Sequence, residues 1–445
     1  MASIQKRGNS YRISVSNGYT SSGKKIVETA TWTPEPGMKS KEIEKALNEF
    51  VVDFERDVKS GKNIKGARMT LKELSKSYLD DVKPPVLERT TYSDYKYRIE
   101  SRILPAMGHI EIGNIRQKDI KNYKKMLRET YKNPKTGKPL SESSLRKDGV
   151  VISAMLSYAV SESLLDMNVL IYAGKVAGRK EARKEVKVKY FTMEQLIRFI
   201  DALERPIEIP HQEHVTTVNG QTYHVNQYVQ TFQVSSKWKL YFYIALFAGD
   251  RRGENVSLTW NDLNIEKCEI TIDKATNYAD RRMELKDTKT HNIRDNTLPP
   301  YVIELAKTWK SEQIQQCFKM GDKWKGHKGK DYDKNFIFTQ ANGTQMHVCS
   351  PYTTYKRIIR IYNQYAVQDE NQKIPTDVPP HGLRHSSAAI LIANNMDART
   401  VSAVLGHANP STTLNIYSYF FKNKGKEAAK IMESTLIPEK AVVTK

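Results

Sequence analysis

The stretch HGLR (381–384) opens a series of polar residues whose order and spacing decide the fold assigned to this chain. LGH (405–407) follows it, and Tyr417 stands ten residues beyond the histidine of that second stretch. Residues three apart on a helix share a face, so His381 and Arg384 should point the same way. Two basic side chains on one helical turn, a second imidazole and a tyrosine indicate a site that handles phosphate.

Two earlier segments add cations to this series. Arg251 lies in GDRRGE (249–254), and Lys289 lies in TKT (288–290). A guanidinium can bind two nonbridging phosphate oxygens through its planar fork. Each piece alone has an ordinary explanation, because such arginines often mark a helix start, lysines in turns are usually solvated, and helical tyrosines usually belong to a core. The ordered set is specific although its single members are not.

The ordered set resembles the active site of the tyrosine recombinases, the phage-integrase family. The resemblance implies one set of catalytic residues: Arg251, Lys289, His381, Arg384, His407 and Tyr417. It also implies an accessory role for Glu254, which would orient the site without reacting. Lys289 would lie on a β-hairpin that enters the minor groove, and it would protonate the leaving 5′-oxygen.

Neighbouring residues compete for some of these roles. Lys286 is the alternative general acid, and Tyr419 is the alternative nucleophile. Arg252 is the alternative to Arg251, but only Arg251 stands at the family's spacing from the glutamate, Glu254. His385 falls off the helical face of the other basic residues, which favours a structural role.

The chain has 445 residues, a formal net charge of +21 and three cysteines. Its length indicates about two to four domains. The excess of Lys and Arg favours a polyanionic partner, and nucleic acid over a membrane, with a merely soluble basic protein as the alternative. The cysteines are too few and too far apart for a disulfide framework or a cysteine-based zinc site, which fits a reducing cytoplasm. We find neither a signal-peptide pattern nor an apolar run long enough to cross a bilayer.

Residues 1–62 are predicted to form a separate module of a small β-sheet and one helix. Residues 11–16 alternate between apolar and polar types, as in a strand, and Asn17-Gly18 indicates a turn. Apolar residues over 43–54 follow helical spacing. The module resembles the arm-site DNA-binding module of many integrases. Its candidate DNA-binding residues are Lys6, Arg7, Lys24 and Lys25.

Residues 69–172 are predicted to form a helical domain. Thr70 and Glu73 have the spacing of a capping box, which starts a helix. The stretch LPAMG (104–108) and a helix over 144–161 follow. This order resembles the helical core-binding, SAM-like domain of tyrosine recombinases, although Asn168-Val169 replaces the Asn-Pro that often ends it in the family.

Residues 173–190 form a linker that is dense in charge. It is either a solvated connection or a strap along a phosphate backbone, where each neutralised phosphate releases counterions. The two interpretations are compatible, and we favour the strap. Its candidate DNA-binding residues are Lys175, Arg179, Lys180, Arg183, Lys184, Lys187 and Lys189.

Residues 191–422 are predicted to form the catalytic domain, a mixed helical domain with a small antiparallel sheet. The fold class expected for the whole chain is therefore mainly α with small β-sheets (α+β). A capping box at Thr192 starts a helix. Residues 205–235, with Asn219-Gly220 inside, are predicted to form a hairpin inserted between two helices.

Three strands, over 269–273, 283–290 and 294–298, are expected to share the small sheet of this domain. Asp397 should cap a helix, and Gly406 should end it. The C-terminal tail, residues 423–445, carries apolar residues at helical spacing.

The resemblance implies a site-specific recombinase, or integrase, that serves a mobile element. Tyr417 would attack the scissile phosphodiester, giving a 3′-phosphotyrosyl enzyme and a free 5′-hydroxyl. Arg251, Arg384 and His407 would stabilise the charge of the transition state, and His381 would orient the phosphate or accept the tyrosine proton. The covalent link retains the free energy of the phosphodiester, so no cofactor, neither ATP nor a metal, is required.

The expected partners follow from the same resemblance. They are double-stranded DNA carrying attachment sites, and further copies of the chain in a tetramer on DNA that exchanges strands through a Holliday junction. The tail is expected to help hold this tetramer, and accessory DNA-bending or excisionase proteins would assist it. Such a protein would be encoded by a bacterium or phage and would lie with the nucleoid in the cytoplasm, with no membrane partner.

Three rival functions remain at this point. A type IB topoisomerase shares the chemistry but relaxes supercoils without exchanging partners. A noncatalytic DNA-binding regulator on the same fold should have lost a catalytic position, and none is lost here. A metal-dependent nuclease needs clustered carboxylates, which these segments lack.

Overall fold

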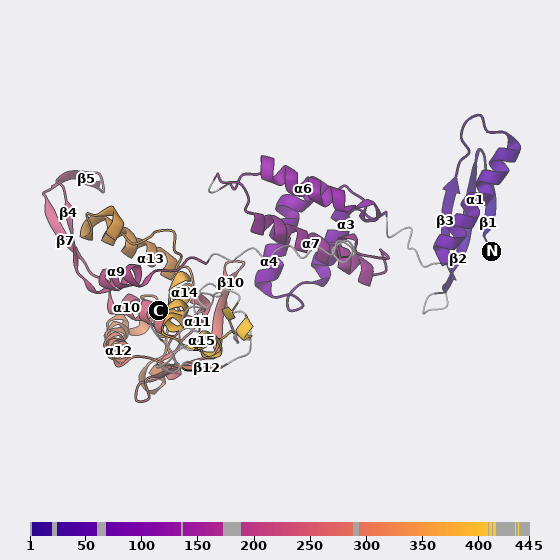
Figure 1. Ribbon diagram of the computed structural model, residues 1–445. Helices are drawn as coiled ribbons and strands as arrows, with labels where there is room; N and C mark the ends of the chain where they lie inside the picture. Colours follow the sequence, from indigo (N-terminus) through magenta and orange to yellow (C-terminus); the bar gives the residue numbers. More distant parts are fainter. Residues whose placement is uncertain are drawn as a thin grey trace, which may run out of the picture. The chain divides into compact units, whose positions relative to one another are not determined.

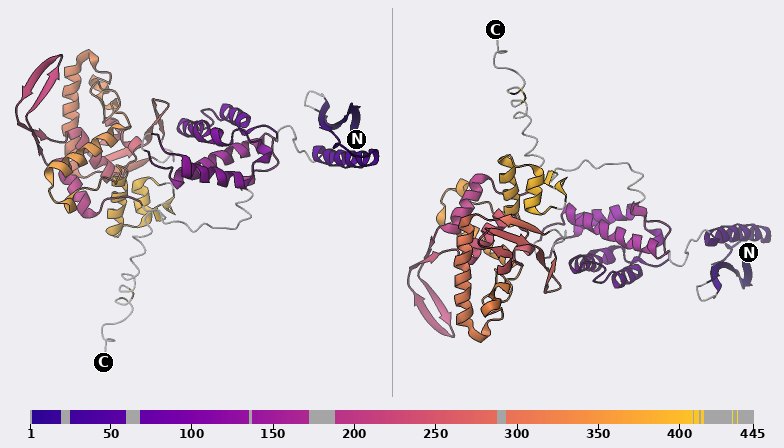
Figure 2. Two further views of the ribbon diagram at one scale, coloured as in Figure 1. Left: turned by 90° about the horizontal axis from the view of Figure 1, so that it is seen from above. Right: turned by 90° about the horizontal axis from the view of Figure 1, so that it is seen from below.

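The computed structural model describes residues 2–19, 25–59, 68–134, 137–171, 188–287, 293–407, 409–411, 413–414, 432 and 435. The chain divides into two compact units, Met1–Arg183 and Lys184–Lys445, and each is described by itself (Figures 1 and 2). The predicted class, mainly α with small antiparallel sheets, is confirmed.

The N-terminal part of the first unit is a three-stranded antiparallel sheet covered by one helix (Figure 1). The strands are β1 (Ser3–Arg7), β2 (Ser10–Tyr19) and β3 (Lys25–Trp32), in the order β1-β2-β3, and the helix is α1 (Ser40–Lys59). The alternation of β2 buries Ile13 and Val15 against Leu47, Phe54 and Val58 of the helix. The predicted strand and helix are therefore present.

The turn predicted at Asn17-Gly18 is wrong. Both residues belong to β2, which continues to Tyr19 and pairs with β3 across a register shift between Ser16 and Tyr19. A bulge lets a strand absorb extra residues without ending, so the hairpin preference of an Asn-Gly pair is overridden by pairing with β3. No pattern in the sequence predicts β1, because its residues are all exposed and show no apolar alternation toward a core.

The rest of the first unit is helical. Thr70 Oγ1 accepts a hydrogen bond from the Glu73 amide, and the Glu73 carboxylate accepts one from the Thr70 amide, so the predicted capping box is confirmed. The helices pack around one apolar cluster that includes Leu74, Ile103 and Ile152. Their bounds are α3 (Leu71–Asp81), α4 (Arg89–Arg98), the π-helix η1 (Ile99–Ile103), α5 (Leu104–Met107), the 3-10 helix η2 (Ile112–Asn114), α6 (Gln117–Thr130) and α7 (Glu142–Ser161).

A buried ion-pair cluster ties α4 and η1 to α7. The fully buried Asp148 carboxylate accepts hydrogen bonds from Arg98 Nη1 at 2.8 Å and from Arg102 Nη2 at 2.6 Å. Tyr123 Oη donates to the same carboxylate at 3.2 Å. Asp148 thus pairs with two arginines that are themselves buried, and Arg98 also donates from Nε to Asp94 at 2.9 Å.

Replacing Asp148 with alanine should destabilise this unit by about 3–5 kcal/mol, because the buried Arg102 would lose its carboxylate partner and the buried Arg98 would retain only the more exposed Asp94. Scanning calorimetry of the full chain should show the corresponding transition at a lower temperature. The control is Glu142→Ala, which breaks the exposed Arg128–Glu142 pair and should leave that transition nearly unchanged. An unshifted transition in the Asp148 variant would contradict the role assigned to the cluster.

The second unit is built around α10 (Ser236–Phe247), which buries residues on all sides, including Leu240, Phe242 and Ile244. A helix that is apolar all round belongs in a core. The surrounding helices are α9 (Met193–Glu204), α11 (Arg252–Asn255), α12 (Pro300–Met320), α13 (Ser350–Ile361), α14 (Gly382–Ala393) and α15 (Ala398–Leu405), with a π-helix η6 (Tyr362–Ala366) and 3-10 helices η3 (Trp260–Asp262), η4 (Gly321–Lys323), η5 (Gly329–Lys334) and η7 (Glu370–Gln372). The capping box at Thr192 is confirmed.

The predicted single sheet of the second unit is wrong in one strand. β12 (Arg294–Thr297), β9 (Glu269–Ile272) and β8 (Leu263–Asn264) form one antiparallel sheet. The strand expected over 283–290 is β11 (Arg282–Asp287), which pairs instead with β10 (Lys274–Ala279) in a separate hairpin. Asp280 and Arg281 both have positive φ, as a two-residue type I′ turn requires, so this local turn decides the pairing.

The predicted insertion is a long two-stranded ribbon. β4 (Ile207–His211) pairs with β7 (Tyr228–Phe232), and β5 (His214–Val218) pairs with β6 (Gln221–Val225). The ribbon lies between α9 and α10 in sequence and projects from its unit (Figures 1 and 2). Asn219 and Gly220 close it with positive φ angles, which confirms the hairpin. No lysine or arginine occurs over 207–232.

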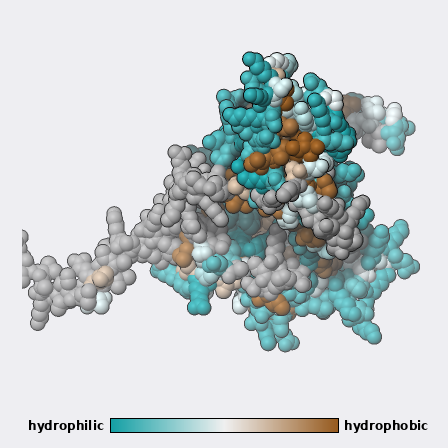
Figure 3. All heavy atoms as spheres, turned by 90° about the vertical axis from the view of Figure 1, so that its right-hand side faces the viewer, coloured by the Kyte–Doolittle hydropathy of each residue, from teal (hydrophilic) through white to brown (hydrophobic). Residues whose placement is uncertain are grey.

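Hydrophilic residues predominate on the face shown in Figure 3, where hydrophobic ones gather in small patches. Within the described ranges, no helix combines the length and the apolar character that crossing a membrane demands.

Candidate active site

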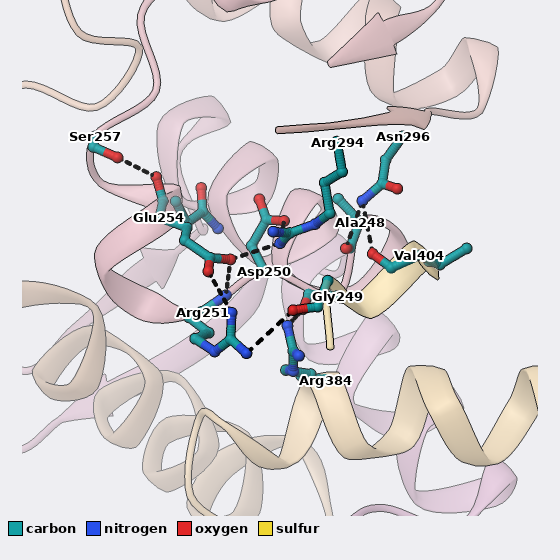
Figure 4. A network of polar contacts seen from close by, with 12 residues as sticks. Ala248, Gly249, Asp250, Arg251, Glu254, Ser257, Arg294, Asn296, Arg384 and Val404 are labelled. Atoms are coloured by element: carbon teal, nitrogen blue, oxygen red, sulfur yellow. Dashed lines mark hydrogen bonds and ion pairs between the residues drawn. The ribbon is translucent and has the colours of Figure 1, made fainter. Parts of the chain in front are cut away.

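Arg251 stands where the chain turns from α10 into α11 (Figure 4). Its Nη1 donates to Glu254 Oε1 at 2.6 Å, and its backbone amide donates to Glu254 Oε2 at 3.0 Å. Gly249 makes the turn possible, since its φ is +60° and a Cβ there would lie 2.5 Å from Leu405 Cδ2. The glutamate three residues on therefore fixes both the backbone and the side chain of Arg251.

Arg384 lies in the first turn of α14 and is only 2% exposed. Its Nη1 donates to the carbonyl oxygen of Gly249 at 2.6 Å, which links α14 to the segment of Arg251 (Figure 4). Its Nη2 is buried and makes no hydrogen bond to any residue that the structure describes. Burial and the charge of Arg251 lower the pKa of Arg384 to about 10, so it remains a cation at neutral pH.

His381 is the N-cap residue of α14, one turn before Arg384. Its ring meets the ring of His385 edge to face, with centroids 4.9 Å apart. His381 as a whole residue is exposed, but its ring is partly desolvated. This desolvation and the positive charges of Arg384 and Arg251 lower the pKa of His381. Burial, together with His381 and Arg384, lowers the pKa of His385 to about 4.

His407 follows α15 as predicted. Asp397 caps this helix by accepting hydrogen bonds from the amides of Arg399 and Thr400, and Gly406 ends it in the left-handed conformation. The ring Nδ1 lies 2.8 Å from Thr413 Oγ1. Burial, Arg384 and Arg251 lower the pKa of His407 to about 4, so the imidazole is neutral at pH 7.

Arg294 and Asp250 complete the cluster, and sequence reasoning missed both. Arg294 Nη2 donates to Glu254 Oε2 at 2.6 Å and to Asp250 Oδ1 at 3.2 Å (Figure 4). Burial raises the pKa of Asp250 to about 7. Burial also disfavours the charge of Glu254, but Arg294 and Arg251 outweigh it and keep the pKa of Glu254 below its ordinary value. No motif marks Arg294 in the sequence, and Asp250 is marked only by its place beside Arg251.

The structure thus brings five of the predicted site residues into one cluster: Arg251, Glu254, His381, Arg384 and His407. Lys289, Tyr417 and the rival Tyr419 lie outside the described residues. Lys286, the alternative acid, lies in β11, with its Nζ 3.5 Å from Glu284 Oε2. Among the described residues, no group of three or more His, Cys, Asp or Glu side chains could hold a metal ion.

The predicted DNA-binding residues are spread over other elements. Lys6 and Arg7 are exposed on β1, and Lys25 lies in β3. Lys189 is exposed and forms an ion pair with Asp377 at 2.8 Å. The remaining candidates lie outside the described residues: Lys24, Lys175, Arg179, Lys180, Arg183, Lys184 and Lys187.

The depressed histidine pKa values predict an acid-sensitive fold. His385 has an ordinary pKa of 6.5 and a folded pKa of about 4, so the folded state prefers the neutral ring. This contribution to stability is complete above pH 6.5 and is lost as the pH falls toward 4, by up to about 3 kcal/mol. We expect the wild type to lose melting temperature relative to His385→Gln across this window.

Asp250 titrates in the opposite sense within the same window, but both proteins carry it, so it cancels in the comparison. His214→Gln, on the exposed strand β5, is the control and should follow the wild type. Parallel curves for wild type and His385→Gln would show that His385 is not held neutral by the fold.

Comparison with known proteins agrees with this geometry. The model of the phage integrase family matches residues 220–423, and the model of the N-terminal SAM-like domain of phage integrases matches residues 70–128. A XerC-like tyrosine recombinase of Caldanaerobacter subterraneus is 23% identical over 96% of both chains. The ICEBs1 integrase of Bacillus subtilis is 24% identical over 78% of both chains.

A solved structure shares the fold. It is the Tn1549 transposon integrase in complex with transposon right end DNA, which aligns with a TM-score of 0.57 at 18% identity. The alignment covers 83% of this chain and 100% of that one.

Two fixed arginines beside His381, His385 and His407, on a helical unit with a small antiparallel sheet, form a site suited to binding a phosphate ester. The two matched segments cover more than half of the chain, and the chain belongs to the phage integrase family of tyrosine recombinases. It is thus an enzyme of site-specific recombination. These findings do not favour a type IB topoisomerase or a noncatalytic regulator.

Proposed function

We propose that this protein is an integrase that cuts and rejoins duplex DNA through a covalent bond to Tyr417. The observation that carries the proposal is the pairing of Arg384 and Arg251. The buried Arg384 is fixed by Gly249 through Nη1, while Arg251 is held from the same segment by Glu254. Two fixed guanidinium groups in one cluster suit the nonbridging oxygens of a single phosphodiester.

The reaction proposed for this site is an in-line displacement. The Tyr417 oxygen forms a bond to phosphorus, and the bond from phosphorus to the 5′-oxygen breaks. His381 accepts the phenolic proton, and Lys289 donates a proton to the departing 5′-oxygen. Arg251, Arg384 and His407 stabilise the charge that develops on the nonbridging oxygens.

His407 suits a hydrogen-bonding role in this scheme. Its neutral ring can donate from Nε2 when Nδ1 accepts a hydrogen bond from the Thr413 hydroxyl. The lowered pKa keeps this donor uncharged, so it adds a directed hydrogen bond beside the two arginine charges.

The rest of the proposed function concerns partners and domains. Residues 1–62 and 69–172 would bind DNA, 173–190 would follow the phosphate backbone, and 191–422 would carry out catalysis. The copies needed to exchange strands would form a tetramer on DNA, held in part by the tail, 423–445. The positive net charge supports DNA as the partner.

A nicked suicide substrate tests the proposal. Nicked duplexes that tile the DNA flanking the coding sequence would be incubated with the protein and resolved in denaturing gels. Cleavage beside a nick releases a short fragment that diffuses away, so the covalent complex accumulates. A protein–DNA band that survives denaturation, formed without ATP or added metal, is expected. Binding to the duplexes without any such band would overturn the proposed function.

A further inference from the structure

Arg294 was not among the predicted site residues, yet it contacts several parts of the candidate site. Its side chain is 8% exposed, and its Nη2 is shared between Asp250 and Glu254. A Cβ built on Gly406 would lie 2.6 Å from Arg294 Nη1, so the guanidinium also lies against the turn that leads into His407. One side chain on β12 therefore meets both segments that carry site residues.

The strand β12 presents a second side chain to the same two segments. Asn296 lies two residues after Arg294, and side chains two apart on a strand point to the same face. Its Nδ2 donates to the carbonyl oxygens of Ala248 at 2.9 Å and Val404 at 3.1 Å (Figure 4). Asn296 thus links the end of α10 to α15. Arg294 links Asp250, which follows α10, to Gly406, which follows α15.

The charges explain why an arginine is needed at this position. The side chains of Asp250 and Glu254 are 0% and 3% exposed, and each accepts a hydrogen bond from Arg294. Without Arg294, Arg251 would be the remaining cation bonded to Glu254, and Arg384 the remaining cation near Asp250. Arg251 would then be drawn toward Glu254, away from a phosphate.

We propose that Arg294 is a positioning residue for strand cleavage. It pairs with Asp250 and holds Glu254, so that Arg251 keeps its direction toward the phosphate and the Gly406 turn keeps His407 in place. Arg294 itself does not touch the DNA. The proposal rests on the proposed function, because its readout is cleavage of DNA.

Two variants separate positioning from mere support of the fold. Arg294→Gln removes the cation that opposes the effect of burial on Asp250, so the buried carboxyl takes up a proton at neutral pH and the lost ion pair should lower the melting temperature. Adding Asp250→Asn replaces that carboxyl with a neutral amide and should restore most of that loss. Glu254 still lacks its second arginine in the double variant, so Arg251 remains misdirected.

The measurements are DNA binding, melting temperature and single-turnover formation of the covalent complex on the nicked substrate with saturating protein. We expect the double variant to bind DNA within about twofold of wild type and to form the complex roughly 100-fold more slowly, as for a misplacement of about 1 Å. Arg294→Lys keeps the positive charge but lacks the planar guanidinium, so it should form the covalent complex faster than Arg294→Gln and more slowly than wild type. Arg205→Gln, which breaks an exposed pair with Asp201, is the matched control and should react like wild type.

Each outcome decides the matter. A double variant that regains both stability and rate would make Arg294 a structural residue only. Arg294→Gln reacting at the wild-type rate would also overturn the proposal. Failure of the wild type to form any complex would instead overturn the proposed function, and this proposal with it.

Discussion

The Tyr417→Phe protein should bind DNA as the wild type does and form no covalent complex with it. Phenylalanine keeps the ring and removes only the hydroxyl that would attack phosphorus. Loss of a nucleophile lowers the rate by more than roughly 1,000-fold, because no other group supplies the missing bond. The measurement is the denaturation-resistant band on the nicked substrate, together with a gel-shift titration of binding.

Tyr419→Phe is the matched control for this experiment. It removes the same atom two residues further along the chain and should leave the band intact. If the band vanished in Tyr419→Phe and persisted in Tyr417→Phe, the nucleophile would be Tyr419. A band in both variants would refute attack by either tyrosine.

Arg384→Gln should lower the rate of cleavage by about 100- to 1,000-fold. Arg384 Nη1 already donates to the Gly249 carbonyl oxygen, so the other guanidinium nitrogens are the ones left to bind a phosphate. The substitution removes these nitrogens and the buried positive charge beside Arg251. Glutamine can still donate one hydrogen bond to the Gly249 carbonyl, but it brings no charge to a phosphate. Single-turnover cleavage with saturating protein would measure the loss apart from any change in affinity.

Arg399→Gln is the control for the removal of one positive charge, since Arg399 is exposed on α15. It should cleave at nearly the wild-type rate. Circular dichroism would check that the Arg384 variant is folded. A folded Arg384→Gln protein that cleaved as fast as the control would show that the phosphate is bound elsewhere.

The predictions that held depend on short-range rules. Capping residues such as Thr70, Thr192 and Asp397 act on amides two or three residues away, so their effect is visible in the local sequence. Gly406 is similar, because a left-handed residue at a helix end favours glycine whatever surrounds it. The ordered basic residues of the site were predicted from a resemblance to a family, and the structure brings five of the predicted site residues into one cluster.

The predictions that failed depend on contacts between distant segments. The Asn17-Gly18 pair has a strong local preference for a turn, and only its pairing with β3 keeps it in a strand. Arg294 meets Glu254 across 40 residues, and no property of either residue in the sequence announces the other. The β10–β11 hairpin turns at Asp280 and Arg281, a pair without the glycine that usually marks such turns.

The ribbon of β4 to β7 has an electrostatic consequence. Attraction to a polyanion scales with the cations that displace its counterions, and this segment supplies none. A chain shortened across 207–232 would keep every lysine and arginine while losing the acidic Glu208 and Glu213. The ribbon therefore adds length to its unit without adding positive charge. The long-range electrostatic attraction to duplex DNA must come from the lysines and arginines elsewhere in the chain.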